Sequence, residues 1–233
     1  MTTQDQDAVS WPSYPHEVLA AVLSVRAGRL CVLLWKRGLA PFHGRWSLPG
    51  GGLAPDQRLR EAITAHLATK VDVRELAHLE QLATHSNVAR DPRARVLATC
   101  YLGLVPTDAS PALPADTAWH PVDALPPTAF DHDFFVAAAI DRLRAKLSYT
   151  NIGFALAPEE FTIAELRDIV SAALGYQVAA TNLLRVLTRR AVIEQTDHMA
   201  APGRSGGRPA ALYRFRAQEL AVTDPFAVLR PPR

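Results

Sequence analysis

A glycine turn followed by a helix is the first place in this sequence where residue types and spacing could support chemistry. The turn lies in residues 46–53, WSLPGGGL, and contains Gly50, Gly51 and Gly52 in succession. Backbone amides that no side chain covers can form a positively polarised concavity for an anion. We therefore expect these three glycines to contact an anionic group of a bound ligand.

Three cations near this turn could complete an anion site. Arg37 and Arg45 precede the turn, and guanidinium groups form strong hydrogen bonds with phosphate oxygens, although each arginine also suits an ordinary surface position. Lys70 ends the helix that follows, and its position allows two interpretations. It could be a solvated cation that complements the helix dipole, or a fixed cation that replaces a metal ion and holds a pyrophosphate without cleaving it.

The helix after the turn carries none of the acidic residues that a catalytic metal site needs. The turn and helix together resemble the Nudix hydrolase motif, in which glutamates one helical turn apart bind magnesium. Counted from Gly51, the three metal-binding positions fall on His66, Thr69 and Lys70. Counting from either neighbouring glycine gives no better match. The sequence thus predicts a Nudix-like fold with no catalytic residues and no metal site.

The elements expected around the turn form an α+β domain, a Nudix-like mixed sheet flanked by helices. An apolar stripe at helical spacing gives the helix after the turn a face to bury under the sheet. Apolar runs predict a hairpin that turns at Ala27–Gly28, a buried strand in residues 94–105 and a short edge strand in residues 118–125. A helix from Asp131 to Leu147 closes this domain.

A second domain, a winged helix-turn-helix, is expected after the first. Thr162 and Glu165 can satisfy each other's backbone amides as a capping box, which marks a helix start. That helix ends at Gly175, and a second helix is expected over residues 181–192, TNLLRVLTRRAV. VIEQ and LYRFR follow as two strands around a loop rich in glycine and arginine. Two helices and a two-stranded wing in this order are typical of DNA-binding domains.

Basic residues are concentrated in this second domain. Residues 178–216 contain seven arginines and two acidic residues, a local charge of +5, whereas the whole chain carries only +2. Arginine and asparagine on the second helix could hydrogen-bond bases in a major groove, and arginines in the loop could neutralise phosphates. The candidate DNA contacts are Thr181, Asn182, Arg185, Thr188 and Arg189 on the helix and Arg204 and Arg208 in the loop. A solvated helix face and a freely exposed arginine loop are the alternatives.

The order of the two domains resembles the NrtR family, bacterial Nudix-related transcriptional regulators of NAD metabolism. The resemblance covers about residues 15–216 and is most specific in the junction LSYTNIGFALAPEEFT and in the wing GGRPAALYRF. It implies a homodimeric repressor whose Nudix-like domain binds ADP-ribose or a related NAD metabolite as its effector. It also implies that the winged helices bind double-stranded DNA at a palindromic operator of NAD biosynthesis or salvage genes.

Composition is that of a globular chain, with 48% hydrophobic residues in a length of 233. No uncharged apolar run reaches about 18 residues, and the polar N-terminus contains Asp5 and Asp7, so neither a signal peptide nor a membrane span is expected. We therefore expect a cytoplasmic protein with no membrane partner. Cys31 and Cys100 each lie in an apolar run and are expected to be buried free thiols.

Residues 1–15 are expected to form a flexible N-terminus, 16–147 the effector-binding domain, 148–216 the DNA-binding domain and 217–233 a tail. The sequence is compatible with three functions. The favoured one is a regulator that responds to a ligand and is not an enzyme. The alternatives are an active ADP-ribose pyrophosphatase with an appended DNA-binding module, and a DNA-binding protein that uses its Nudix-like part only as a dimerisation scaffold.

Overall fold

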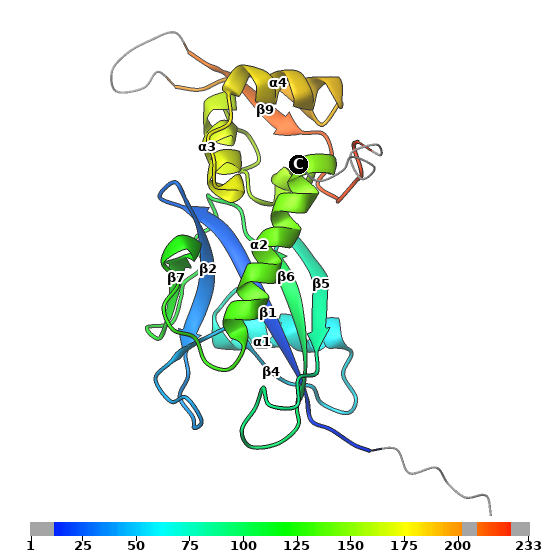
Figure 1. The fold of residues 1–233 in the computed structure, drawn as a ribbon. Coiled ribbons are helices and arrows are strands. Elements are labelled where there is room, and N and C mark those ends of the chain that lie inside the picture. The colour runs from blue at the N-terminus through cyan, green and yellow to red at the C-terminus, as the bar shows by residue number, and fades with distance from the viewer. Residues whose placement is uncertain (1–11, 202–208, 225–233) are drawn as a thin grey trace, which may run out of the picture.

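The N-terminal part of the molecule is a mixed sheet built from strands that are distant in sequence (Figure 1). The computed structural model describes residues 12–201 and 209–224. Strands follow the order β3-β2-β1-β6-β5, with β4 beside β1 and β7 beside β2. β1 and β6 are parallel, and the other pairs are antiparallel. The bounds are β1 (His16–Arg26), β2 (Arg29–Lys36), β3 (Trp46–Ser47), β4 (Gly50–Gly52), β5 (His78–His85), β6 (Leu97–Leu104) and β7 (Thr117–Pro121).

Alternation along β1 explains why the sheet is covered on both faces. Successive side chains of a strand point to opposite faces, so one continuous apolar run can supply two cores. Helix α2 (His132–Tyr149) covers one face and helix α1 (Leu59–Lys70) the other. The α2 side receives Leu19, Ala21, Leu23 and Val25, and the α1 side receives Val18, Ala20 and Val22. The expected Nudix-like mixed sheet flanked by helices is confirmed.

The hairpin, the buried strand and the edge strand lie where the sequence predicts them. β1 and β2 join through Ala27 and Gly28, which have φ of 48° and 73°, as a two-residue hairpin turn requires. β6 is buried along almost its whole length, and β7 extends the sheet beside β2. Helix α2 continues to Tyr149, two residues past the expected end at Leu147.

The two cysteines are core residues. Cys31 and Cys100 are both buried and unpaired, which confirms the expected free thiols. Burial raises the pKa of the Cys100 thiol to about 12, so this side chain remains a neutral apolar group at ordinary pH. Among the described residues, no helix is long and apolar enough to cross a membrane.

The C-terminal part is the expected winged helix-turn-helix (Figure 1). It consists of α3 (Ile163–Leu174), α4 (Ala180–Arg189), β8 (Ile193–Met199) and β9 (Ala211–Phe215). The capping box is confirmed: Thr162 Oγ1 accepts from the Glu165 amide at 3.2 Å, and Glu165 Oε2 accepts from the Thr162 amide at 2.7 Å. Gly175 ends α3 with φ of 81°, the left-handed cap that the sequence predicts.

Helix α4 is shorter than its sequence pattern suggests. The expectation of helix over residues 181–192 was wrong at the C-terminal end, because α4 ends at Arg189. Ala191 adopts φ of 52°, and the amide of Val192 donates to the carbonyl of Leu187 at 2.9 Å. This is a Schellman-type ending with alanine in the position that glycine usually takes. Burial of Val192, which is 4% exposed, stabilises this ending, and no local sequence signal marks it.

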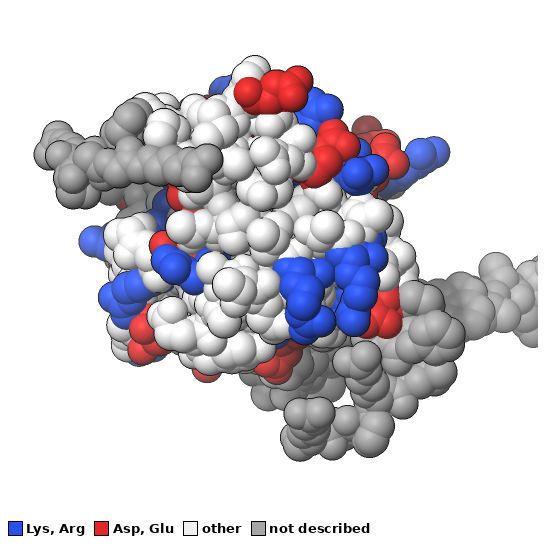
Figure 2. All heavy atoms as spheres, turned by 90° about the horizontal axis from the view of Figure 1, so that it is seen from above, with Lys and Arg blue, Asp and Glu red and all other residues white. Residues whose placement is uncertain are grey.

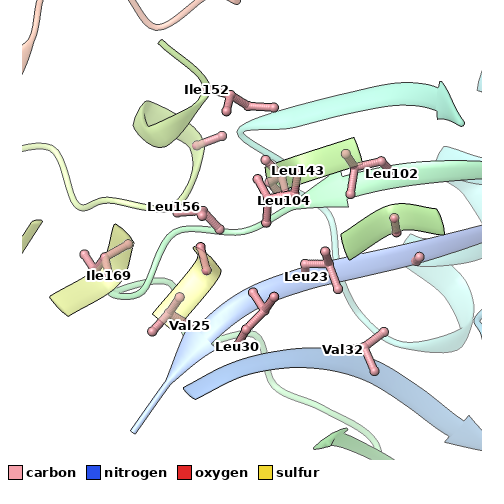
Figure 3. Packing of buried hydrophobic residues seen from close by; sticks show 14 of the residues in the cluster. Leu23, Val25, Leu30, Val32, Leu102, Leu104, Leu143, Ile152, Leu156 and Ile169 are labelled. Atoms are coloured by element: carbon pink, nitrogen blue, oxygen red, sulfur yellow. The ribbon is translucent and has the colours of Figure 1, made fainter. Parts of the chain in front are cut away.

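One hydrophobic core continues from the sheet into the winged helix (Figure 3). Leu23 of β1, Leu30 of β2, Leu143 of α2 and Ile169 of α3 belong to the same buried cluster. A short 3₁₀ turn, η2 (Ile152–Ala155), carries the chain from α2 towards α3 and is buried throughout. The expected domain boundary therefore does not interrupt the packing. Because α2 and α3 share this core, a displacement of α2 would also displace α3.

Residues after the wing return to the junction between α2 and α3. The side chain of Asn151 donates to the carbonyl of Glu219 at 2.8 Å and accepts from the amide of Ala221 at 2.7 Å. Arg190 forms an ion pair with Asp224 at 2.7 Å. Part of the segment expected to be a tail is thus hydrogen-bonded to the chain that links the two halves.

Candidate ligand pocket and nucleic-acid interface

The glycine turn opens into a pocket of about 530 Å³. Its walls come from β1 and β2, from β3 and β4, from the end of α1 and from the first turn of α2. Five residues expected to contact a ligand line this pocket: Arg37, Gly50, Gly51, Gly52 and Lys70. Trp35 and Phe130 add aromatic surface to it. Cations, glycines and aromatic rings in one hollow suit a nucleotide-like anion.

The three glycines form the short strand β4 against the start of β1. A Cβ atom on Gly50 would lie 2.1 Å from the carbonyl oxygen of Val18, and a Cβ atom on Gly51 would lie 2.7 Å from the ring of His66. A Cβ atom on Gly52 would meet no atom within 4 Å. Close packing against the backbone therefore requires glycine at Gly50, a side chain at Gly51 would require the His66 ring to move, and Gly52 is open.

Lys70 is an internal cation of the pocket. Its Nζ donates to the carbonyl oxygen of Gly50 at 2.5 Å and lies 5.0 Å from the centre of the Trp35 ring. Burial, followed by repulsion from the nearby Arg37, lowers the pKa of the Lys70 ammonium below its ordinary value. Lys70 is half-buried and bonded to a backbone carbonyl, a position that fits a fixed cation better than a solvated helix-end cation.

The two arginines near the turn differ in exposure. Arg37 is partly buried, its Nε donates to the carbonyl of Pro41 at 2.7 Å, and its guanidinium lies 4.8 Å from the centre of the Phe130 ring. Arg45 is exposed and does not line the pocket. Its carbonyl accepts from the Arg37 amide at 2.9 Å, so the two arginines lie opposite each other just after β2 and just before β3. Arg37 is the guanidinium that lines the pocket.

At the positions where a Nudix enzyme keeps its metal-binding acids, this chain has side chains that form hydrogen bonds with backbone carbonyls. His66 Nε2 lies 3.0 Å from the carbonyl oxygen of Gly52, and Thr69 Oγ1 donates to the carbonyl of Ala65 at 2.8 Å. His66 and Lys70 thus contact the carbonyls of the glycine turn, whereas Thr69 is exposed and bonds to its own helix. In the described ranges, no group of three or more His, Cys, Asp or Glu residues could hold a metal ion.

A buried ion network behind the pocket is absent from the sequence prediction. Arg90 has a side chain only 1% exposed, and its Nη1 donates to Glu17 Oε1 at 2.6 Å. Its Nε and Nη2 donate to the two oxygens of Asp131 at 3.1 and 2.9 Å. His85 Nδ1 lies 2.7 Å from the same carboxylate. Because Glu17 lines the pocket and Asp131 precedes α2, the network joins the pocket to the root of that helix.

His132, in the first turn of α2, also lines the pocket. Its Nδ1 accepts from the amide of Leu48 at 2.9 Å, so Nε2 carries the proton of the neutral ring. Burial lowers the pKa of His132 to about 3. Within the described part of the chain, Nε2 of His132 and Oγ of the neighbouring Ser47 are buried without hydrogen-bond partners. The pocket thus has buried polar groups that a ligand or water could satisfy.

Helix α4 presents its polar residues to solvent. Leu183 is turned inward, and the candidate DNA contacts Thr181, Asn182, Arg185, Thr188 and Arg189 are all exposed. Arg185 Nη2 donates to Asn182 Oδ1 at 2.7 Å, so the two side chains best suited to read bases are already adjacent. Arg204 and Arg208, expected in the wing loop, lie outside the described residues.

A groove of about 1050 Å³ separates α4 from the wing. Thr181, Arg185, Thr188 and Arg189 line one side, and Glu194 and Arg216 line the other. Glu194 pairs with Arg214 at 2.7 Å and with Arg216 at 3.6 Å, two arginines that entered the charge count but not the expected contacts. Figure 2 looks onto this end of the molecule and shows separate groups of Lys and Arg, with Asp and Glu between some of them.

Two family models match this chain. The NUDIX domain model matches residues 15–139, and the NrtR DNA-binding winged helix domain model matches residues 153–215. A curated relative, the ADPR responsive transcriptional repressor NtrR of Acinetobacter baylyi, is 33% identical over 230 residues, which cover 96% of this chain and 90% of the relative.

Solved structures of Shewanella oneidensis NrtR are similar as well. The structure complexed with a 27mer DNA is 31% identical with a TM-score of 0.75, over 86% of this chain and 93% of that one. The NUDIX domain complexed with ADP ribose is 30% identical with a TM-score of 0.51, over 60% of this chain and 94% of that one. With a Nudix fold, a winged helix and a relative matched along nearly its whole length, this chain belongs to the NrtR family.

Proposed function

We propose that this protein is a transcriptional repressor that binds DNA through its winged helix and senses ADP-ribose, or a related NAD metabolite, in its Nudix domain. The observation that carries the proposal is the position of Lys70. A Nudix enzyme needs an acid there for magnesium, whereas this chain places a fixed ammonium against the glycine turn of a cation-lined pocket. Such a site can bind a pyrophosphate and supplies no metal to cleave it. The names of the Acinetobacter and Shewanella relatives support the same ligand and the same role.

The DNA side of the proposal rests on α4 and the wing. The exposed polar face of α4 would enter a major groove, and arginines of the wing would contact phosphates. A single winged helix offers only a small interface, so we expect a homodimer that binds a palindromic site in double-stranded DNA. The genes behind such a site would belong to NAD biosynthesis or salvage.

Effector and DNA would be coupled through α2. His132, in the first turn of this helix, lines the pocket, and Arg144 near its other end donates to the carbonyl of Ala173 in α3 at 3.2 Å. Ligand binding that shifts the root of α2 would therefore move the winged helix and change the spacing of the two helices α4 in a dimer. Coupling of this kind is typically worth about 1 to 3 kcal/mol.

Two experiments test the proposal. The purified protein is incubated with ADP-ribose and either magnesium or manganese, and we expect no release of AMP. Hydrolysis that a chelator abolishes would contradict the non-enzymatic role.

In the second experiment, genomic DNA fragments captured by the protein are sequenced, and we expect an inverted repeat near genes of NAD metabolism. Capture of unrelated fragments at random would contradict the repressor.

A further inference from the structure

We propose that Glu17 makes the pocket select a ribose hydroxyl beside the pyrophosphate and reject a phosphate ester at that position. The inference rests on the proposed function, because it assigns one further contact within the same pocket. It narrows the effector to a dinucleotide-like molecule whose ribose is free of added phosphate. No motif in the sequence marks this glutamate.

Glu17 lies at the edge of the glycine turn. It is the second residue of β1, where it pairs in register with Gly52 of β4 on one side and Ala98 of β6 on the other. Its side chain is 21% exposed and lines the same pocket as Arg37 and Lys70. Among the described residues, the pocket lining therefore has one carboxylate as well as two cations.

Arg90 holds this carboxylate in place through one oxygen only. Nη1 of Arg90 donates to Oε1 of Glu17 at 2.6 Å, while Nε and Nη2 of the same guanidinium are used by Asp131. Across the described ranges, Oε2 of Glu17 accepts no hydrogen bond. Since one guanidinium serves two carboxylates, Arg90 does not neutralise both. Glu17 is thus a fixed, negatively charged acceptor with one oxygen available.

A fixed carboxylate distinguishes ligand groups that donate hydrogen bonds from ligand groups that are anionic acceptors. An ionised carboxylate only accepts hydrogen bonds, so its ligand partner must be a donor such as a hydroxyl or an amine. A phosphate ester is itself an anionic acceptor and would meet electrostatic repulsion. Dinucleotide-binding folds make the same distinction: an acidic residue binds a free ribose hydroxyl, and an arginine binds a ribose phosphate.

The position of Glu17 in the same pocket as the two cations favours a ribose as the donor. Glu17 is close enough to Arg37 and Lys70 to favour their charged forms and so to oppose the lowering of their pKa values by burial. If those two cations hold the pyrophosphate, the donor that meets Glu17 must be near it in the ligand. Each ribose of ADP-ribose is attached directly to the pyrophosphate, whereas the adenine amine lies beyond a ribose.

The test compares three ligands by calorimetry on the full-length protein. They are ADP-ribose, its 2′-phosphate, which alters the adenosine ribose, and its 1″-phosphate, which alters the terminal ribose. We expect one of the two phosphorylated ligands to bind at least about tenfold more weakly than ADP-ribose, and its identity shows which ribose Glu17 contacts. Glu17→Gln keeps an acceptor for Arg90. In this variant the dissociation constants of the phosphorylated ligand and of ADP-ribose should differ by no more than about threefold.

Two further variants separate selection from folding. Glu17→Asp keeps the charge, so it should keep the rejection of the phosphorylated ligand. Glu75→Gln removes an exposed acid outside the pocket and should leave all three affinities unchanged. Equal binding of the three ligands to the unaltered protein, or a ratio that Glu17→Gln does not change, would overturn the assignment of Glu17. Failure of the unaltered protein to bind ADP-ribose at all would overturn ADP-ribose as the effector and this inference with it.

Discussion

Helices α1 and α4 both carry cations on a polar face, and they place those cations in opposite ways. Lys70 of α1 is partly buried, bonded to a carbonyl and close to an aromatic ring. Arg185 and Arg189 of α4 are exposed. A cation held in one geometry by the fold suits a small anion of fixed shape, because little side-chain entropy is left to lose on binding. Exposed arginines can adapt to a long groove with many phosphates and base edges.

The comparison shows that residue type alone does not assign a ligand. From the sequence, Lys70 and Arg189 are both basic residues in the last turn of a helix. The difference arises because Gly50 brings a backbone carbonyl within reach of Lys70, whereas the surroundings of α4 leave its polar face in solvent. Burial therefore separates the basic residues that we propose for the effector from those that we propose for DNA.

The largest effect is expected where the fold of the pocket depends on a missing side chain. Gly50→Ala would place a Cβ 2.1 Å from the backbone of Val18, so we expect it to lower the free energy of unfolding by about 3 kcal/mol. Gly52→Ala, with no atom within 4 Å of the added carbon, is the matched control and should change stability by less than about 0.5 kcal/mol. Equal urea midpoints for both variants would show that the turn tolerates a side chain.

Loss of the arginines of α4 should affect DNA and leave the effector untouched. Arg185→Ala and Arg189→Ala are each expected to weaken operator binding by about 1 to 3 kcal/mol if they read bases. ADP-ribose affinity of both variants should stay that of the unaltered protein. Arg74→Ala, which removes another exposed arginine, provides the control in a fluorescence anisotropy titration. Operator binding as tight as in the unaltered protein would mean that α4 is not the recognition helix.

Acid should destabilise the pocket through His132. The pKa of His132 is lowered from 6.5 to about 3, so between these values the unfolded chain binds a proton that the folded chain does not. The free energy of unfolding is therefore unaffected by this group near neutral pH and decreases as the pH falls below 6.5. At about pH 5 the decrease is about 2 kcal/mol. In His132→Gln, the free energy of unfolding measured by urea denaturation should depend less on pH. The exposed His43→Gln is the control, and an unchanged slope in His132→Gln would contradict the assignment.

A smaller effect is expected from removing the fixed cation. Lys70→Met should weaken ADP-ribose binding by about 1.5 kcal/mol, the value of one hydrogen bond to a charged group, and leave operator affinity unchanged. We expect Arg45→Ala to weaken it less, by under about 0.5 kcal/mol, because an exposed cation is screened by water. Calorimetry measures both values. A greater loss in Arg45→Ala than in Lys70→Met would reverse the order of the two cations.

Sequence patterns predicted most of the fold because its elements carry local signals. The hairpin turn at Ala27–Gly28, the capping box of Thr162 and the cap at Gly175 each depend on a few neighbouring residues. The end of α4 was missed because Ala191 takes a left-handed conformation that burial of Val192 stabilises. Tertiary packing decides such a position, and the nearby sequence does not record it.

The pocket was predicted only in part, for the same reason. Its glycines and cations stand in or near a recognisable turn, so Arg37 and Lys70 could be proposed from the sequence. Glu17, Arg90 and His132 come from β1, a loop and α2 and meet only in the folded chain. No spacing rule joins residues that are 73 positions apart, as Glu17 and Arg90 are. The wing residues Arg204 and Arg208 remain predictions.

A reciprocal titration measures whether the pocket and the DNA-binding face are coupled. Operator affinity is measured with and without ADP-ribose, and ADP-ribose affinity is measured with and without operator. Linkage requires both to change by the same factor, expected to be about 5- to 150-fold. Ribose 5-phosphate controls for charge, because any anion weakens DNA binding to some extent.

We expect ADP-ribose to weaken operator binding, ribose 5-phosphate to have no comparable effect, and Arg37→Ala to keep operator binding while losing the response. Equal factors in the two directions would establish that one protein couples both ligands. If ribose 5-phosphate acts as strongly as ADP-ribose, or if operator leaves ADP-ribose affinity unchanged, the Nudix domain is a scaffold and the account of a sensor is contradicted.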